Sequence, residues 1–325
     1  MIDDHFIGFD LGGTKMLVKV YDSDYKVLSR LKVKTPTGIS FKEGLAGMVD
    51  LVHLALKEAG LDKNSLAGLG IGVPGPVDPS TGTALILSNM GWKNVPMETG
   101  LAEALHCPVK VVNDVDAGIY GEYRFGAARE ADCALGIFPG TGIGGGLIHR
   151  DEIFSSRTRT CMEIGHLRVR EGGELCGCGN FGCLETVSSR LAIAKNAAVA
   201  ALRGQAPYLL KAVGSRLDKI KSAVLAASIA AGDHSVELIV RDAARHLGKA
   251  VGNMVNLLSP DVVVFGGGIV KAMPKLFMEE VTTGCEETAV VSYRNTFRLV
   301  PAALGDEATA AGAAAWARKI QEKSS

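Results

Sequence analysis

Asp10-Leu11-Gly12-Gly13-Thr14-Lys15 joins two short apolar segments, residues 5–10 and 16–21, that both have the pattern of β-strands. Because it joins strand to strand, it is a hairpin and differs from the strand-to-helix phosphate loops of the Walker and dinucleotide-binding kinds. Its paired glycines allow backbone N–H groups to approach phosphate oxygens, Thr14 and Lys15 add donors, and Asp10 can hold magnesium through water. Taken alone, the segment fits a plain glycine hairpin with a buried aspartate equally well.

A second glycine-rich segment, Gly140 to Gly146, favours the phosphate-binding interpretation. It holds five glycines and Thr141 between an expected strand at 134–138 and another at 147–149. So high a density of glycine costs folding entropy, and close approach of a ligand to the backbone explains it better than turn formation does. A third loop, Gly266-Gly267-Gly268, follows an apolar strand at 262–265 and opens a helix, where a purine or ribose can rest on the backbone.

The elements around these loops recur in a similar order in the two halves of the chain. The first half has the order β-β-β-α-β-α-β-α, with strands expected at 5–10, 16–21, 27–33, 66–73 and 109–112, and helices expected at 41–56, 97–105 and after Asn113-Asp114. The second half echoes it with insertions, including an Ala-rich helical region from about 191 to 258, a strand near 297–300 and a last helix from about 306. Two such β-turn-β grips that face each other across a cleft can clamp a nucleotide. The sequence therefore predicts an α/β fold of two similar halves.

The bulk composition indicates an ordinary folded protein of two domains. The chain has 325 residues, more than a single core usually supports, and 47% of them are hydrophobic. Lys plus Arg and Asp plus Glu both total 35, so no charge bias favours nucleic acid or an anionic membrane, and a small molecule is the expected partner. No apolar run approaches the roughly 18 residues that span a bilayer, and the N-terminus has no signal-like segment. We therefore expect a cytoplasmic protein that binds neither nucleic acid nor membrane.

Three of the seven cysteines form the most informative stretch. Cys176, Cys178 and Cys183 fall within eight residues, and His166 precedes them. Three thiolates and one imidazole can close a tetrahedral zinc site with no open position, which indicates a structural metal. The alternatives are three reduced thiols in a flexible loop, or a redox switch.

Three carboxylates are candidates for sugar binding or proton transfer. Glu163 and Glu185 flank the metal ligands, so a folded metal site would aim both at one place, where sugar hydroxyls are natural partners. Asn113-Asp114 ends an apolar strand and starts a helix, which would point it into the cleft between the halves. Phosphoryl transfer to a sugar hydroxyl uses a carboxylate that takes the hydroxyl proton, and Asp114 is the candidate base. The competing interpretation is an N-cap aspartate without further function.

Together these segments resemble the ROK family of sugar kinases and sugar-responsive repressors, within the actin-like ATPase superfamily. The resemblance spans nearly the whole chain and rests on residues 10–15, 72–78, 113–114, 140–146, 163–166, 176–185 and 266–268. It implies a two-lobed, ribonuclease H-like fold with duplicated βββαβαβα domains and a zinc-binding insertion. The smaller lobe would comprise residues 1–114 and about 306–325, and the larger lobe residues 115–305.

The family pattern implies roles for individual residues. ATP phosphates, with Mg²⁺, would lie between the loops at 10–15 and 140–146, and Asp114 would be the catalytic base. The ATP-binding positions would be Asp10, Gly12, Gly13, Thr14, Lys15, Gly140, Thr141, Gly142, Gly266 and Gly267. The sugar-binding positions would be Gly75, Asn113, Asp114, Glu163, His166 and Glu185. A structural zinc ion would be held by His166, Cys176, Cys178 and Cys183, so that His166 serves both metal and sugar.

The activity implied by the resemblance is ATP-dependent phosphorylation of glucose to glucose 6-phosphate. N-acetylglucosamine, N-acetylmannosamine, mannose, fructose and allose are alternative substrates, and a homodimer or homotetramer is the usual assembly in the family. A non-catalytic sugar sensor, or an actin-like scaffold or chaperone, is the alternative of another class. The repressor branch carries a helix-turn-helix domain ahead of the first strand, whereas here the first loop begins at residue 10 and both loops are intact, which favours an enzyme.

Two places depart from the family pattern. Residues 155–162, Ser-Ser-Arg-Thr-Arg-Thr-Cys-Met, are bulkier than the small residues usual beside the sugar, and either a different substrate or different packing accounts for them. Asp116 stands where the family often has Asn. A carboxylate there would raise the pKa of Asp114 by like-charge repulsion unless it is exposed on the helix, which is what we expect.

Overall fold

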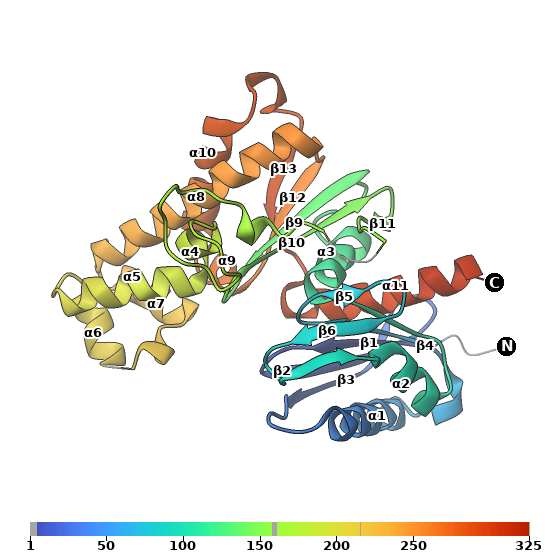
Figure 1. Ribbon diagram of the computed structural model, residues 1–325. Helices are drawn as coiled ribbons and strands as arrows, with labels where there is room; N and C mark the ends of the chain where they lie inside the picture. Colours follow the sequence, from blue (N-terminus) through green and yellow to red (C-terminus); the bar gives the residue numbers. More distant parts are fainter. Residues whose placement is uncertain (1–4, 158–160, 215, 325) are drawn as a thin grey trace. The chain divides into compact units, whose positions relative to one another are not determined.

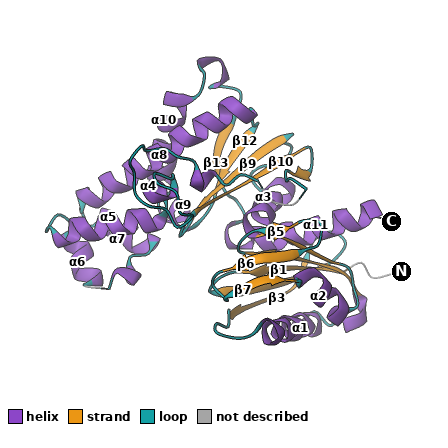
Figure 2. Cartoon of the chain, viewed as in Figure 1, coloured by secondary structure: helices purple, strands orange, loops and turns teal. Residues whose placement is uncertain are grey.

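The computed structural model describes residues 5–157, 161–214 and 216–324 (Figures 1 and 2). The chain divides into two compact units of similar length: unit 1 comprises residues 1–130, 146–161 and 306–325, and unit 2 comprises residues 131–145 and 162–305. Unit 1 therefore extends beyond the boundary expected at residue 114. The reason is that the helix that begins at residue 114 packs against the C-terminal helix, which also lies in unit 1.

Unit 1 is built on a five-stranded sheet with the order β3-β2-β1-β4-β8. Strands β1 (His5–Leu11), β2 (Lys15–Tyr21) and β3 (Val27–Lys34) form an antiparallel meander, and β4 (Leu66–Val73) and β8 (Val109–Asn113) run parallel to β1, all close to the predicted positions. Helices α1 (Phe41–Glu58) and α2 (Met97–Leu105) cover one face of the sheet, and α3 (Asp114–Phe125) and α11 (Ala308–Ser324) cover the other (Figure 1). Helix α1 starts at a capping box of Ser40 and Glu43 and ends before Gly60, whose φ of 73° favours glycine.

A second, three-stranded sheet of unit 1 was not predicted from the sequence. Its strands are β5 (Val77–Asp78), β6 (Thr83–Leu87) and β7 (Trp92–Val95), in the order β5-β6-β7 and antiparallel. Segments of two to five residues are too short to show the alternation by which strands are predicted.

Glycines explain why a helix distant in sequence packs so closely in unit 1. A Cβ placed on Gly8 would lie 1.9 Å from the carbonyl oxygen of Ala310, and one placed on Gly70 would lie 1.8 Å from that of Ala313. On α11 itself, a Cβ at Gly312 would lie 1.8 Å from the Ala117 carbonyl of α3. Helix α11 therefore lies with its backbone directly against the sheet and α3, at distances that only glycine permits.

The other five-stranded sheet has the order β11-β10-β9-β12-β13. Its strands are β9 (Cys133–Pro139), β10 (Ile143–His149), β11 (Glu152–Ile153), β12 (Val262–Phe265) and β13 (Arg298–Pro301), and the division between the units falls within β10. In both five-stranded sheets the central strand is the one that precedes a glycine-rich loop, β1 in one and β9 in the other. That the halves are duplicated βββαβαβα domains stays a prediction.

The Ala-rich region of unit 2 is helical, as predicted, but it forms several helices. These are α5 (Arg190–Leu202), α6 (Pro207–Val213), α7 (Ser222–Ala230) and α8 (His234–Leu258), preceded by the short α4 (Glu185–Ser188) and followed, after β12, by α9 (Gly268–Ala272) and α10 (Pro274–Thr288). Among residues 5–157, 161–214 and 216–324, no helix combines the length and the apolar character needed to span a bilayer.

Candidate functional site

The carboxyl ends of three parallel strands in unit 1 form the first part of the candidate site. Asp10 of β1 pairs with Gly72 of β4, and Val73 of β4 pairs with Asn113, the last residue of β8. Asp114 then begins α3. Open α/β sheets bind their ligands at the carboxyl ends of adjacent parallel strands. The fold therefore places Asp10, Asn113 and Asp114 together at the carboxyl ends of the strands of this sheet.

Helix α3 is capped by Asn113 and not by Asp114. The Oδ1 of Asn113 accepts hydrogen bonds from the backbone N–H groups of Val115 at 2.9 Å and Asp116 at 3.3 Å, and its Nδ2 donates to the carbonyl oxygen of Gly75 at 3.0 Å. The Asp114 carboxylate accepts a hydrogen bond from the N–H of Val115 at 3.0 Å. The interpretation of Asp114 as an N-cap is therefore wrong, and its carboxylate is left for another role.

Burial sets the proton affinity of the two carboxylates at this edge. It raises the pKa of Asp114 from the ordinary 3.8 to about 6, although hydrogen bonds from the backbone oppose the shift. The pKa of Asp10 rises to about 7, mainly through burial and then through the negative charge of Asp114, while Lys32 lowers it. A carboxylate with a pKa near 6 is ionised at neutral pH and still basic enough to take a proton, which suits a general base.

Asp116 is buried, with 1% of its surface exposed, so the expectation that it is exposed on α3 is wrong. Its side of the helix packs against β10, where a Cβ at Gly146 would lie 2.9 Å from the Asp116 Oδ1. Repulsion by Asp116 is nevertheless not what raises the pKa of Asp114, because burial is the main cause. The carboxylate that interacts electrostatically with Asp114 is Asp10.

The first glycine loop is held by Thr35, which was not predicted from the sequence. Thr35 is buried, its hydroxyl donates to the Gly12 carbonyl at 2.6 Å, and its N–H donates to the Thr14 carbonyl at 3.0 Å. A Cβ at Gly13 would lie 2.2 Å from the Nδ2 of Asn89, so glycine leaves room for that side chain. Thr14 and the neighbouring lysine are exposed, and their donors are available to a ligand.

The second glycine loop is shorter than predicted. The turn comprises Gly140 to Gly142, and the later glycines of the run belong to β10. A Cβ at Gly145 would lie 2.4 Å from the Met162 carbonyl oxygen, so a contact within the protein requires glycine there. At Gly140 a Cβ would meet no atom nearer than 4.0 Å. Approach of a ligand therefore explains at most part of the run, which corrects the interpretation made from glycine density alone.

Two residues that were not predicted from the sequence lie at this turn: Arg190 bonds to it, and Ser189 precedes Arg190 and caps α5. Arg190, the first residue of α5, donates from its backbone N–H to the Gly140 carbonyl at 2.9 Å and from Nη2 to the Thr141 hydroxyl at 2.9 Å. Ser189 caps α5 by accepting from the N–H of Ala192 at 3.1 Å. A serine before an Ala-rich helix is a start signal that the sequence offered.

The third glycine loop has a packing explanation of its own. A Cβ at Gly266 would lie 2.4 Å from the ring of Phe138, and one at Gly267 would lie 2.7 Å from the Pro139 carbonyl oxygen. Gly267 also has a φ of 90° at the start of α9. Glycine is therefore required at both positions without any ligand, and a role for them in binding the nucleotide stays a prediction.

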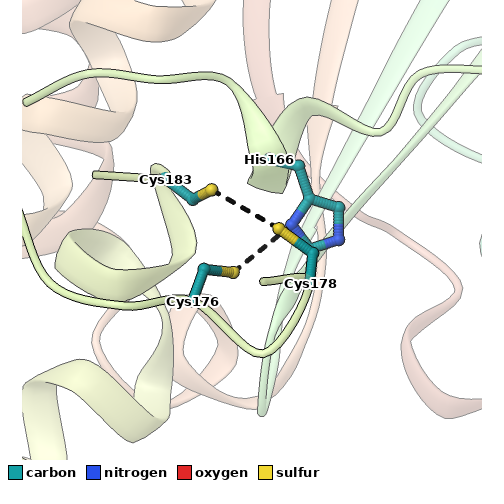
Figure 3. A group of neighbouring side chains, drawn as sticks. All are labelled: His166, Cys176, Cys178 and Cys183. Atoms are coloured by element: carbon teal, nitrogen blue, oxygen red, sulfur yellow. Dashed lines mark hydrogen bonds between the residues drawn. The ribbon is translucent and has the colours of Figure 1, made fainter. Parts of the chain in front are cut away.

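His166, Cys176, Cys178 and Cys183 come together in unit 2 and point toward one another (Figure 3). Their ligand atoms all lie within 4.8 Å of one another. The Sγ atoms of Cys178 and Cys183 are 3.7 Å apart, and the Cys176 Sγ is 3.6 Å from the His166 Nδ1. In a tetrahedron with Zn–S of about 2.3 Å and Zn–N of about 2.0 Å, these edges would be about 3.8 and about 3.5 Å. The four residues thus fit a closed zinc site.

The backbone around the cysteines is folded tightly enough to hold this geometry. The N–H of Cys176 donates to the Asn180 carbonyl at 2.8 Å, across a turn in which Gly179 has a φ of 91°. Gly182 has a φ of 77°, and a Cβ there would lie 1.9 Å from the Arg170 carbonyl oxygen. Glycines at these positions therefore allow the chain to turn around the cluster.

Glu163 and Glu185 approach His166 from its two ring nitrogens. The Nε2 lies 3.9 Å from the Glu163 Oε2, and the Nδ1 lies 3.8 Å from the Glu185 Oε1, which also accepts from the Cys176 thiol at 2.8 Å. A metal on Nδ1 would leave the Nε2–H to donate toward Glu163 or a ligand hydroxyl. The other oxygen of Glu185 faces the second loop, since a Cβ at Gly142 would lie 2.6 Å from it. Glu185 therefore connects the cysteine cluster to the glycine loop.

Comparison with known sequences places these features in one family. The sequence profile of the ROK family matches residues 6–320. The chain is 31% identical to a glucokinase of Halalkalibacterium halodurans over all of this chain and 98% of that one, and 30% identical to a glucokinase of Thermotoga maritima over 95% of each. A putative xylose repressor of Caldicellulosiruptor is 27% identical over 95% of this chain and 77% of the repressor.

Solved structures agree with the sequence comparison. A ROK family glucokinase of Streptomyces griseus, in complex with glucose and AMPPNP, has a TM-score of 0.80 at 32% identity over 97% of this chain and 99% of that one. The ROK hexokinase of Thermus thermophilus has a TM-score of 0.83 at 30% identity over 99% of this chain and 100% of that one. These neighbours imply the actin-like ATPase fold with mixed α/β sheets.

Proposed function

Because the chain belongs to the ROK family and is a sugar kinase, we propose that it transfers the γ-phosphoryl group of ATP to glucose, giving glucose 6-phosphate. About 30% identity to several glucokinases supports glucose as the sugar. The observation that carries the mechanism is the Asp114 carboxylate, which is not needed as a helix cap and has a pKa raised to about 6.

In the proposed reaction, Asp114 is the general base. The sugar hydroxyl oxygen attacks the γ-phosphorus, the bond from phosphorus to the bridging oxygen of ADP breaks, and the hydroxyl proton passes to the Asp114 carboxylate. The exposed Thr14 and Lys15 and the backbone of Gly12, Gly13, Gly140 and Gly142 would bind the phosphates, with Thr141, Gly266 and Gly267 completing the nucleotide site. Mg²⁺ supplies charge neutralisation of the phosphates when bound, and Asp10 would hold it through water.

Sugar recognition is proposed for two groups of residues. Asn113 and Gly75, already joined by a hydrogen bond of 3.0 Å, would contact the sugar together with Asp114. Glu163, His166 and Glu185 would accept from and donate to the other hydroxyls. A structural zinc ion on His166, Cys176, Cys178 and Cys183 would fix the positions of the two glutamates by fixing the loop that carries them.

A panel assay tests the proposed activity. ADP release, coupled to a dye-linked reaction, is measured with Mg-ATP and glucose, mannose, fructose, allose, N-acetylglucosamine or N-acetylmannosamine. We expect glucose to give the highest kcat/KM. A higher value for another hexose or an N-acetylhexosamine would replace glucose as the substrate but keep the kinase. No sugar-dependent ADP release, together with measurable sugar binding, would instead support a non-catalytic sugar-sensing regulator like the repressors of the family.

The pH profile tests the role of Asp114 in the unmodified protein. The base must be ionised in order to take a proton, and its pKa is raised from 3.8 to about 6. We therefore expect kcat/KM to be level above about pH 7 and to fall about tenfold per pH unit below pH 6. A profile that stays level down to pH 4.5, with circular dichroism showing an intact fold, would contradict a base with this environment.

Assembly as a homodimer or homotetramer is also proposed, from family resemblance alone. Light scattering coupled to size-exclusion chromatography tests it. A mass of 34.0 kDa, that of a single chain, would contradict it.

A further inference from the structure

We propose that the guanidinium of Arg190 binds the phosphates of the nucleotide at the second glycine loop. Arg190 would act beside the glycines as a charged group that positions ATP. The inference rests on the proposed function, because that function places ATP phosphates at residues 140–142.

Arg190 is attached to the loop at two points. Its backbone N–H donates to the Gly140 carbonyl and its Nη2 donates to the Thr141 hydroxyl, both at 2.9 Å. These bonds come from the main chain and the side chain of one residue. They hold the guanidinium next to the turn whose backbone and hydroxyl would bind phosphate. The side chain is neither fully buried nor fully exposed, so it is accessible to a ligand at the turn.

In the part of the chain that the structure describes, no carboxylate oxygen lies within 4.0 Å of the Arg190 guanidinium, whose Nη2 donates to the Thr141 hydroxyl. Other arginines of unit 2 differ: Arg241 and Arg245 each contact Glu280 at 2.9 Å. Nor does the first turn of α5 contain an acidic residue. The carboxylate nearest the turn is that of Glu185, whose Oε1 accepts from the Cys176 thiol at 2.8 Å and whose Oε2 would lie 2.6 Å from a Cβ on Gly142.

The chemistry of arginine suits a phosphate group as the ligand at this turn. A guanidinium has five N–H donors in a fixed plane, and the bond to Thr141 uses a single one of them. The remaining donors match the oxygens of a phosphate group, to which arginine binds through two parallel hydrogen bonds. The positive end of the α5 dipole adds to the attraction, because Arg190 is the first residue of that helix.

The test is nucleotide binding by Arg190→Gln in the full-length protein, measured by calorimetry without sugar for adenosine, ADP and ATP. Glutamine keeps a donor for Thr141 but removes the positive charge. We expect ATP affinity to fall by about tenfold or more, ADP affinity to fall less, and adenosine affinity to stay unchanged. Arg203→Gln is the matched control, because Arg203 is exposed at the other end of α5. This variant should bind all three ligands like the wild type.

Each outcome supports or overturns the assignment. Equal losses for adenosine and ATP would mean that Arg190 only maintains the loop, and unchanged ATP binding would mean that it has no role. Arg190→Lys should recover part of the ATP affinity, because it restores the charge. In the kinase assay, Arg190→Gln should raise KM for ATP and leave KM for the sugar unchanged. If no sugar is phosphorylated but the pattern across adenosine, ADP and ATP holds, the proposed function fails while the assignment of Arg190 stands.

Discussion

Replacement of Asp114 by Asn is expected to lower kcat for the sugar by roughly 100- to 10,000-fold, the range that general-base catalysis contributes. Asparagine has the same shape, and its Oδ1 can still accept from the Val115 N–H, which bonds Asp114 at 3.0 Å. The cap of α3 is unaffected because Asn113 provides it. The variant therefore loses the capacity to take a proton and little else. Steady-state ADP release measures the effect, with KM for ATP expected to change little.

The same variant is expected to be more stable than the wild type at neutral pH. Burial raises the pKa of Asp114 to about 6, so the folded state binds its proton more tightly than the unfolded state, with its ordinary pKa of 3.8. The favourable contribution is present below pH 3.8 and is lost as the pH rises through 6. At pH 7.5 the ionised carboxylate therefore costs up to about 3 kcal/mol, which Asn would remove.

Denaturant unfolding at two pH values checks this sign. The gain in the free energy of unfolding for Asp114→Asn over wild type should be largest at pH 7.5 and should shrink at pH 5. Asp50→Asn, the same chemical change at an exposed position on α1, is the control and should alter neither activity nor stability. A variant with near-normal kcat would remove Asp114 from the mechanism. One that loses activity and stability together would show a folding defect instead.

The parts of the site that the sequence predicts well are those in which residue type and local spacing together determine the structure. The hairpin around Gly12 and Gly13 lies between two strands of ordinary length, and Cys176, Cys178 and Cys183 are close in sequence. The three cysteines and His166 are brought together in the structure as predicted. Local patterns are preserved because a short chain segment leaves few alternative arrangements.

Contacts between distant segments are what the sequence does not reveal. Thr35, the residue after β3, bonds the Gly12 carbonyl of the first loop, and the side chain of Asn89 lies where a Cβ on Gly13 would be. Arg190 of α5 bonds Thr141 of the second loop. Each is an ordinary polar residue with no motif of its own, and its partner is remote in the chain. Asp116 was misjudged for a similar reason, because its burial depends on β10 packing against α3.

The glycine-rich segments showed where the loops lie, but they did not show why glycine is required at each position. At Gly145, Gly266 and Gly267 the atoms that exclude a side chain belong to the protein itself. Glycine density therefore located the loops correctly, but it could not separate a ligand from a neighbouring strand. Gly140, where a Cβ would meet no atom nearer than 4.0 Å, keeps ligand approach as its explanation.

The second large effect is expected on removing one zinc ligand, through the change Cys178→Ser. Cys178 is exposed, so the loss of its sulfur leaves no cavity in the core, and any large destabilisation must come from the metal. A metal that binds only the folded state adds its binding free energy to stability. We therefore expect zinc content, measured by mass spectrometry of the elements, to fall from one per chain to near zero. The free energy of unfolding should fall by roughly 3 kcal/mol or more.

Cys133→Ser is the matched control, because Cys133 lies on β9 outside the cluster and the chemical change is the same. It should keep its zinc and its stability. If Cys178→Ser melts like the wild type, the cluster does not hold a structural metal. If zinc is lost, the effect should extend to activity, because Glu185 contacts the Cys176 thiol on one side and the Gly142 turn on the other. KM for the sugar should then rise along with the loss of stability, whereas a metal that only stabilised the fold would leave KM unchanged in the protein that remains folded.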